Sequence, residues 1–202
     1  KYFYNGVINF SPFSSNLKVN LKNIDLKKLF KNDSFFVEIM KSNIFSNENL
    51  NFNIKLNSKN ILDHRKLKNL DLNINYENES LNFNQSNLLF EDVALIRLVD
   101  SEFRNTKNKQ YIVGEFDILV NDYKNLYRFF QTKKEFRKKI NNINFTVKYD
   151  FFKNKLSFEK LSIDDQSTEG TEYVISLFNQ KNKIIKNRID LKNFFNSIVE
   201  EL

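Results

Sequence analysis

Few residues in this chain have the types and spacing that catalysis or metal binding requires. His64 is the only histidine and there is no cysteine, so a thiolate metal site is excluded and a histidine ligand would have no companion. A Ser–His pair would have to use the same His64, and no serine lies in a G-x-S-x-G turn. His64 stands between Asp63 and Arg65, which is typical of a histidine in a surface loop.

Phosphate-binding loops and acid–base pairs are equally hard to find. Asp164 and Asp165 are adjacent, and neighbours on a strand point to opposite faces, so they make a poor acid–base pair. Nucleotide-binding loops need several glycines close together. The chain has three, far apart: Gly6, Gly114 and Gly170. We therefore predict a non-enzymatic protein with no catalytic residues, no metal and no cofactor.

Positive charge is concentrated in one segment of a chain whose net charge is +7. Tyr123, Leu126 and Phe130 have helical spacing, so we predict an amphipathic helix over 121–140 with a basic opposite face. This face could contact lipid headgroups or nucleic acid, or it could be an ordinary solvated face. The aromatic residues lie on the apolar side, which disfavours nucleic acid. The expected headgroup contacts are Lys124, Arg128, Lys138 and Lys139.

Alternation of apolar and polar residues, the pattern of half-buried strands, dominates the rest of the chain. It is clearest at 17–21, 50–56, 70–76 and 143–149. Less regular strands are expected at 5–10, 81–90, 93–101, 110–120 and 155–164. Gly114 and Glu115 interrupt the alternation, which predicts a β-bulge there. The short connections favour an antiparallel meander.

Two further helices are expected, one beginning at Asp25 and one at 191–202 with Asp190 as its N-cap. The predicted fold class is mainly β (α+β): a curved antiparallel β-meander that forms an open groove or partial barrel, with a few packed amphipathic helices. The chain begins at Lys1 and has no run near the roughly 20 apolar residues of a membrane span. We expect residues 1–202 to be a single β-rich domain, a fragment of a longer membrane-anchored protein.

The one-sided apolar strands have two interpretations. Their apolar face is either a core sealed by the helices or an open groove that could hold acyl chains. The strands carry more apolar surface than three modest helices would cover, which favours the groove. The residues expected to line it are Leu50, Phe52, Ile54, Leu72, Ile74, Phe145, Val147 and Phe158.

The pattern over most of the chain resembles the AsmA-like family, relatives of TamB and of the bridge-like lipid-transfer proteins. The resemblance rests on the alternating strands, on the segments 88–103 and 111–117, and on the helix that follows at 123–130. The segments 114–118 and 6–10 share a glycine followed by alternating apolar residues. The chain departs from the family in its helical content and in lacking an N-terminal membrane span.

This resemblance implies a non-catalytic envelope protein that is anchored in the inner membrane and faces the periplasm of a Gram-negative-type bacterium. It implies a long apolar β-groove through which phospholipid, or other apolar cargo, moves toward the outer membrane and so supports outer-membrane biogenesis. The expected partners are phospholipid, the membrane and envelope proteins, and no nucleic acid. The first alternative is a protein-interaction or scaffold β-domain with a sealed core, and the second is a nucleic-acid binder through 121–140.

Overall fold

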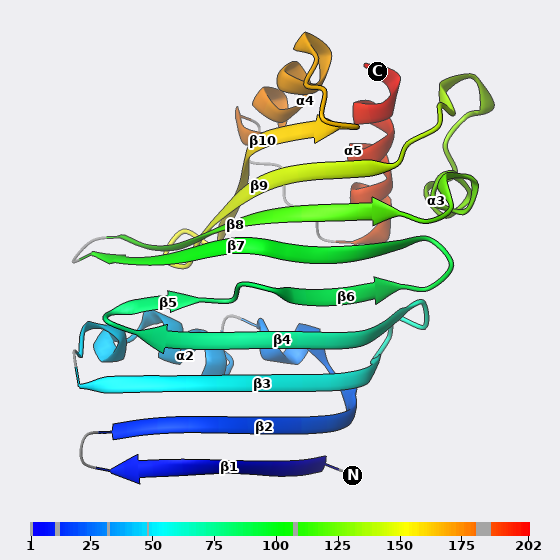
Figure 1. The fold of residues 1–202 in the computed structure, drawn as a ribbon. Coiled ribbons are helices and arrows are strands. Elements are labelled where there is room, and N and C mark those ends of the chain that lie inside the picture. Colours follow the sequence, from blue (N-terminus) through cyan, green and yellow to red (C-terminus); the bar gives the residue numbers. More distant parts are fainter. Residues whose placement is uncertain (1, 11–12, 32, 48, 107–108, 181–186) are drawn as a thin grey trace.

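A single sheet organises the molecule. The computed structural model describes residues 2–10, 13–31, 33–47, 49–106, 109–180 and 187–202, and over these residues the chain forms a ten-stranded sheet with helices behind it (Figure 1). The spatial order is β1-β2-β3-β4-β5-β7-β8-β9-β10, with β6 between β4 and β7. The sheet stays open as a mainly β structure, so the predicted fold class is confirmed. The strands are β1 (Tyr2–Phe10), β2 (Phe13–Ile24), β3 (Leu50–Ile61), β4 (Leu67–Glu77), β5 (Ser80–Asn82), β6 (Ser86–Phe90), β7 (Ala94–Thr106), β8 (Lys109–Val120), β9 (Asn142–Asp150) and β10 (Lys155–Ile163).

The sheet is mixed rather than purely antiparallel. β2 and β3 run parallel, with Leu17 opposite Ile54, whereas the other pairs are antiparallel. A parallel pair needs a long crossover, and the segment between these strands contains three short helices. The expectation of an uninterrupted meander is therefore wrong at this one connection.

Two irregularities occur in the middle strands. The extra residue of the bulge between β7 and β8 is Val99 on β7, between Leu98 and Asp100. The predicted bulge at Gly114 is wrong, because Gly114 stays in phase with its neighbours on β8. The expected strand 81–90 is split into β5 and β6, and Ser101 on β7 accepts the Phe83 N–H (2.6 Å) at the break.

Several helices begin at side-chain caps. Asp25 accepts the Lys28 N–H (3.0 Å), as predicted, but the last helix begins after Asn187, and Asp190 lies in its first turn rather than at the cap. The expected helix 121–140 ends at Phe130, because Gln131 takes a left-handed conformation (φ 52°). The helices are α1 (Leu26–Leu29), α2 (Phe35–Lys41), η1 (Asn43–Ser46), α3 (Tyr123–Phe130), η2 (Lys134–Phe136), α4 (Glu169–Gln180) and α5 (Arg188–Glu200).

The helices form three clusters on the apolar face of the sheet. Alternation puts most apolar residues of the strands on one face, and in Figure 1 α2 and α5 lie behind the strands on that face. One cluster packs α3, α4 and α5 over β9 and β10. A second packs α2 and η1 over β4, β5 and β7. The third is small and places α1 against Ile24, Ile61 and Leu70.

Candidate functional site

A line of mostly apolar side chains crosses the sheet at right angles to the strands. It follows from register, since most members lie opposite the next on the neighbouring strand, and Ser86 is linked to β4 by accepting the Asn73 N–H (2.9 Å). The line connects the two helix-covered regions, and we call it the central row. Its members, from β1 to β10, are Tyr4, Val19, Leu56, Leu72, Ser86, Leu98, Phe116, Phe145 and Leu161.

Two apolar residues, Phe116 on this row and Ile54 beside it, lie outside the three clusters, and we call their surroundings the seam. Ile54 is half-buried and belongs to none of the three, although its strand neighbours Phe52 and Leu56 each pack against one. Phe116 is also half-buried outside the clusters and stacks on Phe145, with ring centroids 5.1 Å apart. Ile54 and Phe116 therefore keep partial solvent exposure on a face that is otherwise packed beneath the helix clusters.

Toward β1 the apolar face becomes open. On β2, Leu17 and Val19 are half-buried and lie outside the clusters. On β1, Tyr4 is 76% exposed and Ile8 is 46% exposed. The uncovered apolar surface thus widens from the middle of the sheet to its β1 edge.

The eight residues expected to line a groove all lie on this face. Leu50, Phe52, Leu72 and Ile74 pack against the α2 cluster as half-buried residues. Phe145 and Val147 border the α3–α5 cluster in the same way. Ile54 lies in the seam. Phe158 is only 8% exposed and packs against Phe178 and Phe194 beneath α4 and α5, so it is part of the core.

Sequence reasoning did not single out several members of the central row. Val19, Leu56, Leu98 and Phe116 lie on it, yet none was expected to line the groove. The signal that finds them is the pairing register, which decides which apolar residues of different strands line up. A single sequence shows the alternation within each strand but leaves the alignment between strands open.

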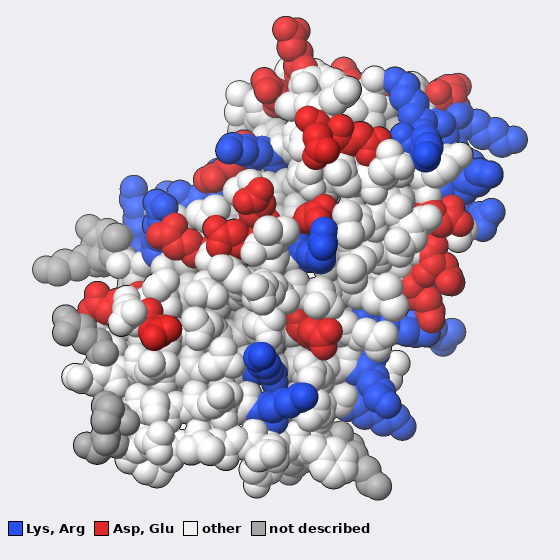
Figure 2. All heavy atoms as spheres, in the orientation of Figure 1, with Lys and Arg blue, Asp and Glu red and all other residues white. Residues whose placement is uncertain are grey.

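The opposite face of the sheet is mostly polar and faces the viewer in Figures 1 and 2. Across β2, β3 and β4 it carries rows of asparagine, such as Asn16 opposite Asn53, with Asn53 opposite Asn75. Asn57 donates to Asn20 Oδ1 (3.2 Å) between two of these strands. The sheet therefore separates a hydrated face from an apolar one.

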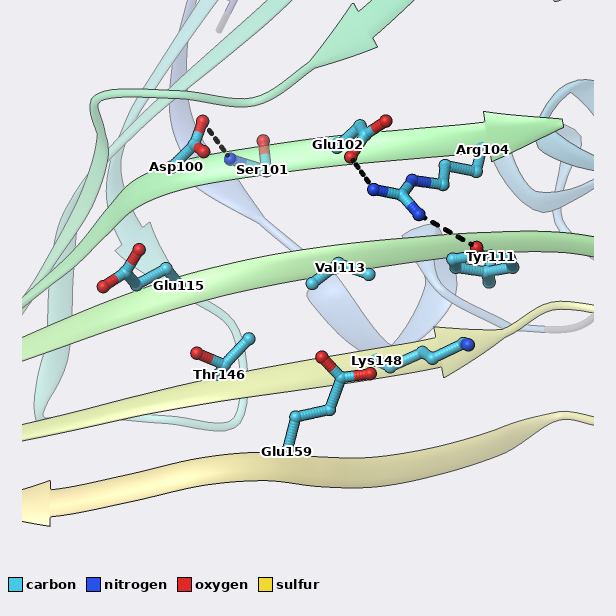
Figure 3. A pocket seen from close by; sticks show the side chains of 10 residues that line it. All are labelled: Asp100, Ser101, Glu102, Arg104, Tyr111, Val113, Glu115, Thr146, Lys148 and Glu159. Carbon is cyan, nitrogen blue, oxygen red and sulfur yellow. Dashed lines mark hydrogen bonds and ion pairs between the residues drawn. The ribbon is translucent and has the colours of Figure 1, made fainter. Parts of the chain in front are cut away.

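A shallow pocket of about 220 Å³ lies on the polar face, over β7–β10 (Figure 3). Arg104 donates to Glu102 (2.7 Å) and to the Tyr111 hydroxyl (3.5 Å). The hydrogen bond from Arg104 to Glu102 lowers the pKa of the Glu102 carboxyl. The Lys148 ammonium lies 3.9 Å from the centre of the Tyr111 ring. Carboxylates outnumber cations around the pocket, which disfavours an anionic headgroup there. None of the eight expected groove residues lines it.

The residues that the sequence offered for catalytic chemistry, His64, Asp164 and Asp165, make hydrogen bonds that hold turns in place. His64 is exposed, and its backbone N–H donates to the Ile61 carbonyl (3.3 Å). Asp164 accepts the backbone N–H groups of Asn141 and Asn142 (2.8 and 2.9 Å). Asp165 accepts from the Asn144 side chain (3.1 Å). These two carboxylates therefore hold the β10 turn against β9.

The four basic residues expected to meet headgroups are exposed but do not share one helix face. Lys124 and Arg128 lie on α3, and Arg128 donates to Asn125 Oδ1 (2.8 Å). Lys138 and Lys139 lie beyond η2, and the Lys138 carbonyl accepts the Tyr127 hydroxyl (2.7 Å). A basic helical stripe over 121–140 is therefore absent, although all four cations remain solvent-accessible.

No family model, curated protein or solved structure matches the chain. The described residues contain no group of three or more His, Cys, Asp or Glu side chains placed to hold a metal ion. Within the same residues, no helix is both long enough and apolar enough to span a membrane. The two faces of the sheet are therefore the features of the molecule that bear on function.

Proposed function

We propose that this protein binds phospholipid, or apolar cargo of similar shape, along the central row of its apolar sheet face without catalysis. The observation that carries the proposal is the seam between the helix clusters, where Ile54 and Phe116 stay half-buried outside the packed clusters. An AsmA-like role in phospholipid transfer between envelope membranes is the cellular function that would use such a surface.

The physical basis is burial of methylene groups against the apolar side chains. Each methylene that leaves water contributes about 0.8 kcal/mol. Because the row crosses β2 to β9 with apolar residues at nearly every strand, an acyl chain could shift by one strand and find similar contacts. Transfer along the row then needs no cofactor and no covalent step.

The decisive experiment compares two variants, each with one new carboxylate, on opposite faces of the same strand. Ile54→Asp puts the charge in the seam, and the matched control Asn53→Asp puts it on the polar face one residue away. A second pair, Val19→Asp and Asn20→Asp, repeats the comparison on β2. Bound phospholipid is measured by native mass spectrometry after purification, and affinity by titration with a fluorescent phospholipid.

Ile54→Asp and Val19→Asp should lose lipid, while both controls should keep it. The affinity should fall about ten-fold or more, since losing contact with two methylenes already corresponds to about 1.6 kcal/mol. Circular dichroism establishes that each variant is folded. If the wild-type protein neither carries nor binds phospholipid, the apolar face is closed, and the scaffold-domain alternative replaces lipid binding.

A further inference from the structure

The two outer strands of the sheet differ in how their free edges are protected. On β10 the Asn179 side chain, from α4, accepts the Phe158 N–H (3.0 Å) and donates to the Phe158 carbonyl (2.7 Å). The strand also carries the charged residues Lys155, Glu159 and Lys160. Charges and covering elements are the usual means by which proteins prevent pairing at a sheet edge. β10 is therefore a closed edge.

β1 lacks these protective features of sequence. Its residues Tyr2–Phe10 include no charged residue and no proline, and it pairs with β2 without a register shift. On the apolar face it exposes Tyr4 and Ile8. On the opposite face Phe3 is 69% exposed and Val7 is 63% exposed, whereas β2 and β3 carry Asn, Lys and Ser there over 14–20 and 51–57. An uncharged edge with apolar residues on both faces favours pairing with another strand.

We propose that β1 pairs antiparallel with β1 of a second copy of this chain, so that one sheet continues through a two-fold dimer. The chain has a net charge of +7, but β1 itself is uncharged, so two copies can meet here without repulsion between opposed charges. The proposed dimer does not depend on lipid binding.

A pairing centred on Asn5 makes the strand complementary to itself. Phe3 then lies opposite the second copy's Val7, which buries the two exposed apolar side chains of the polar face against each other. Tyr4 lies opposite Gly6, where its ring can pack against the Leu17 side chain that covers Gly6, and the two Asn5 side chains meet at the axis. Cross-strand pairs of these types stabilise antiparallel sheets.

Glycine at position 6 is required by the close approach of β2, where Asn16 and Leu17 leave no room for a side chain. A Cβ atom on Gly6 would lie 2.3 Å from the Asn16 carbonyl oxygen and 2.5 Å from Leu17 Cδ2. Leu17 therefore already covers the Gly6 backbone on the apolar face, and a ring from the opposing strand would pack against the Leu17 side chain.

The symmetry of this contact predicts a closed dimer. Antiparallel neighbours in a sheet are related by an axis perpendicular to it, so both apolar faces lie on the same side and the central rows meet at β1. Because each copy offers one open edge and one closed edge, association stops at two copies rather than growing into a filament.

One test measures mass in solution with residues 1–202. Light scattering over a wide concentration range should show a monomer that becomes a dimer as the concentration rises. Val7→Lys should remove the dimer because it places like charges at the contact. The matched control Asn16→Lys, on the neighbouring strand and the same face, should keep it. Circular dichroism verifies that both variants are folded.

A second test leaves the edge nearly unchanged. The chain has no cysteine, so Asn5→Cys introduces a unique thiol at the proposed axis, and a short dithiol-reactive reagent should link two copies. Asn16→Cys lies one strand further from the axis and should not be linked. A monomer at every concentration, higher oligomers, a dimer retained in Val7→Lys, or equal linking at both positions would each overturn the proposal.

Discussion

Tyr127 places a polar group inside the core beneath α3, and its surroundings explain how the core accepts it. The side chain is fully buried, and its hydroxyl donates to the Lys138 carbonyl (2.7 Å). Burial raises the pKa of Tyr127 to about 12, because the phenolate would lose its hydration there. The hydrogen bond also ties the segment after η2 to α3, which helps to explain why that segment is not helical.

Replacing Tyr127 with phenylalanine should change both the stability and its dependence on pH. At neutral pH, Tyr127→Phe should lower the free energy of unfolding by about 1 kcal/mol through the lost hydrogen bond. The folded pKa of about 12 exceeds the unfolded pKa of about 10. The wild-type protein therefore keeps this contribution below pH 10 and loses it as the pH rises toward 12.

The measurement is urea unfolding of both proteins at pH 7, 9 and 11. Other groups that titrate in this range affect both proteins, so the difference between them isolates Tyr127. The stability gap should narrow between pH 9 and pH 11. A gap that stays constant over this range would mean that Tyr127 ionises in the folded protein as easily as in the unfolded chain.

At the scale of single residues, the sequence identified the apolar face but not its degree of cover. Ile54 and Phe158 have the same alternation in their strands, yet Ile54 lies in the seam and Phe158 is buried under α4 and α5. Burial of a strand residue depends on which helix crosses it, and this packing is set by residues distant in the sequence. The alternation alone therefore could not separate a seam residue from a core residue.

At the scale of elements, strands were easier to predict than helices. The expected strands correspond to observed ones, because the period-two pattern persists over many residues. α2 and α4 were not predicted. α4 does carry a helical pattern in Val174, Ile175 and Phe178, but α2 spans only seven residues, too few for its period to stand out. The parallel pairing of β2 and β3 depends on this missed crossover.

The contact of α4 with β10 predicts a large effect from one side chain. Asn179→Ala removes both hydrogen bonds to the Phe158 backbone and should destabilise the protein by about 1–3 kcal/mol, since two backbone groups next to the core lose their partners. Asn193→Ala is the matched control, because Asn193 is exposed on the neighbouring helix α5. Urea unfolding compares the two, and equal small effects would show that the edge of β10 is not sealed by Asn179.

At the scale of the whole molecule, one sheet carries separate packed regions. The cluster beneath α3–α5 and the cluster beneath α2 share no residue, and the seam with Ile54 and Phe116 runs between clusters. A sheet can join two such regions through its backbone ladder even where its side chains leave a gap. The apolar face is thus open where the clusters do not touch each other. Whether they touch can be tested by measuring the energetic coupling between substitutions in the two clusters.

The losses of unfolding free energy caused by substitutions in the two clusters should therefore add. Val37→Ala lies in the α2 cluster and Ile198→Val in the α3–α5 cluster; each should cost about 1–2 kcal/mol of unfolding free energy. The double variant should lose their sum to within about 0.5 kcal/mol, as distant sites do. Ile175→Val with Ile198→Val, both in the α3–α5 cluster, is the comparison pair that can couple. Strong coupling between Val37 and Ile198, seen in urea unfolding, would mean that the clusters form one continuous core, and a continuous core would close the seam that lipid binding requires.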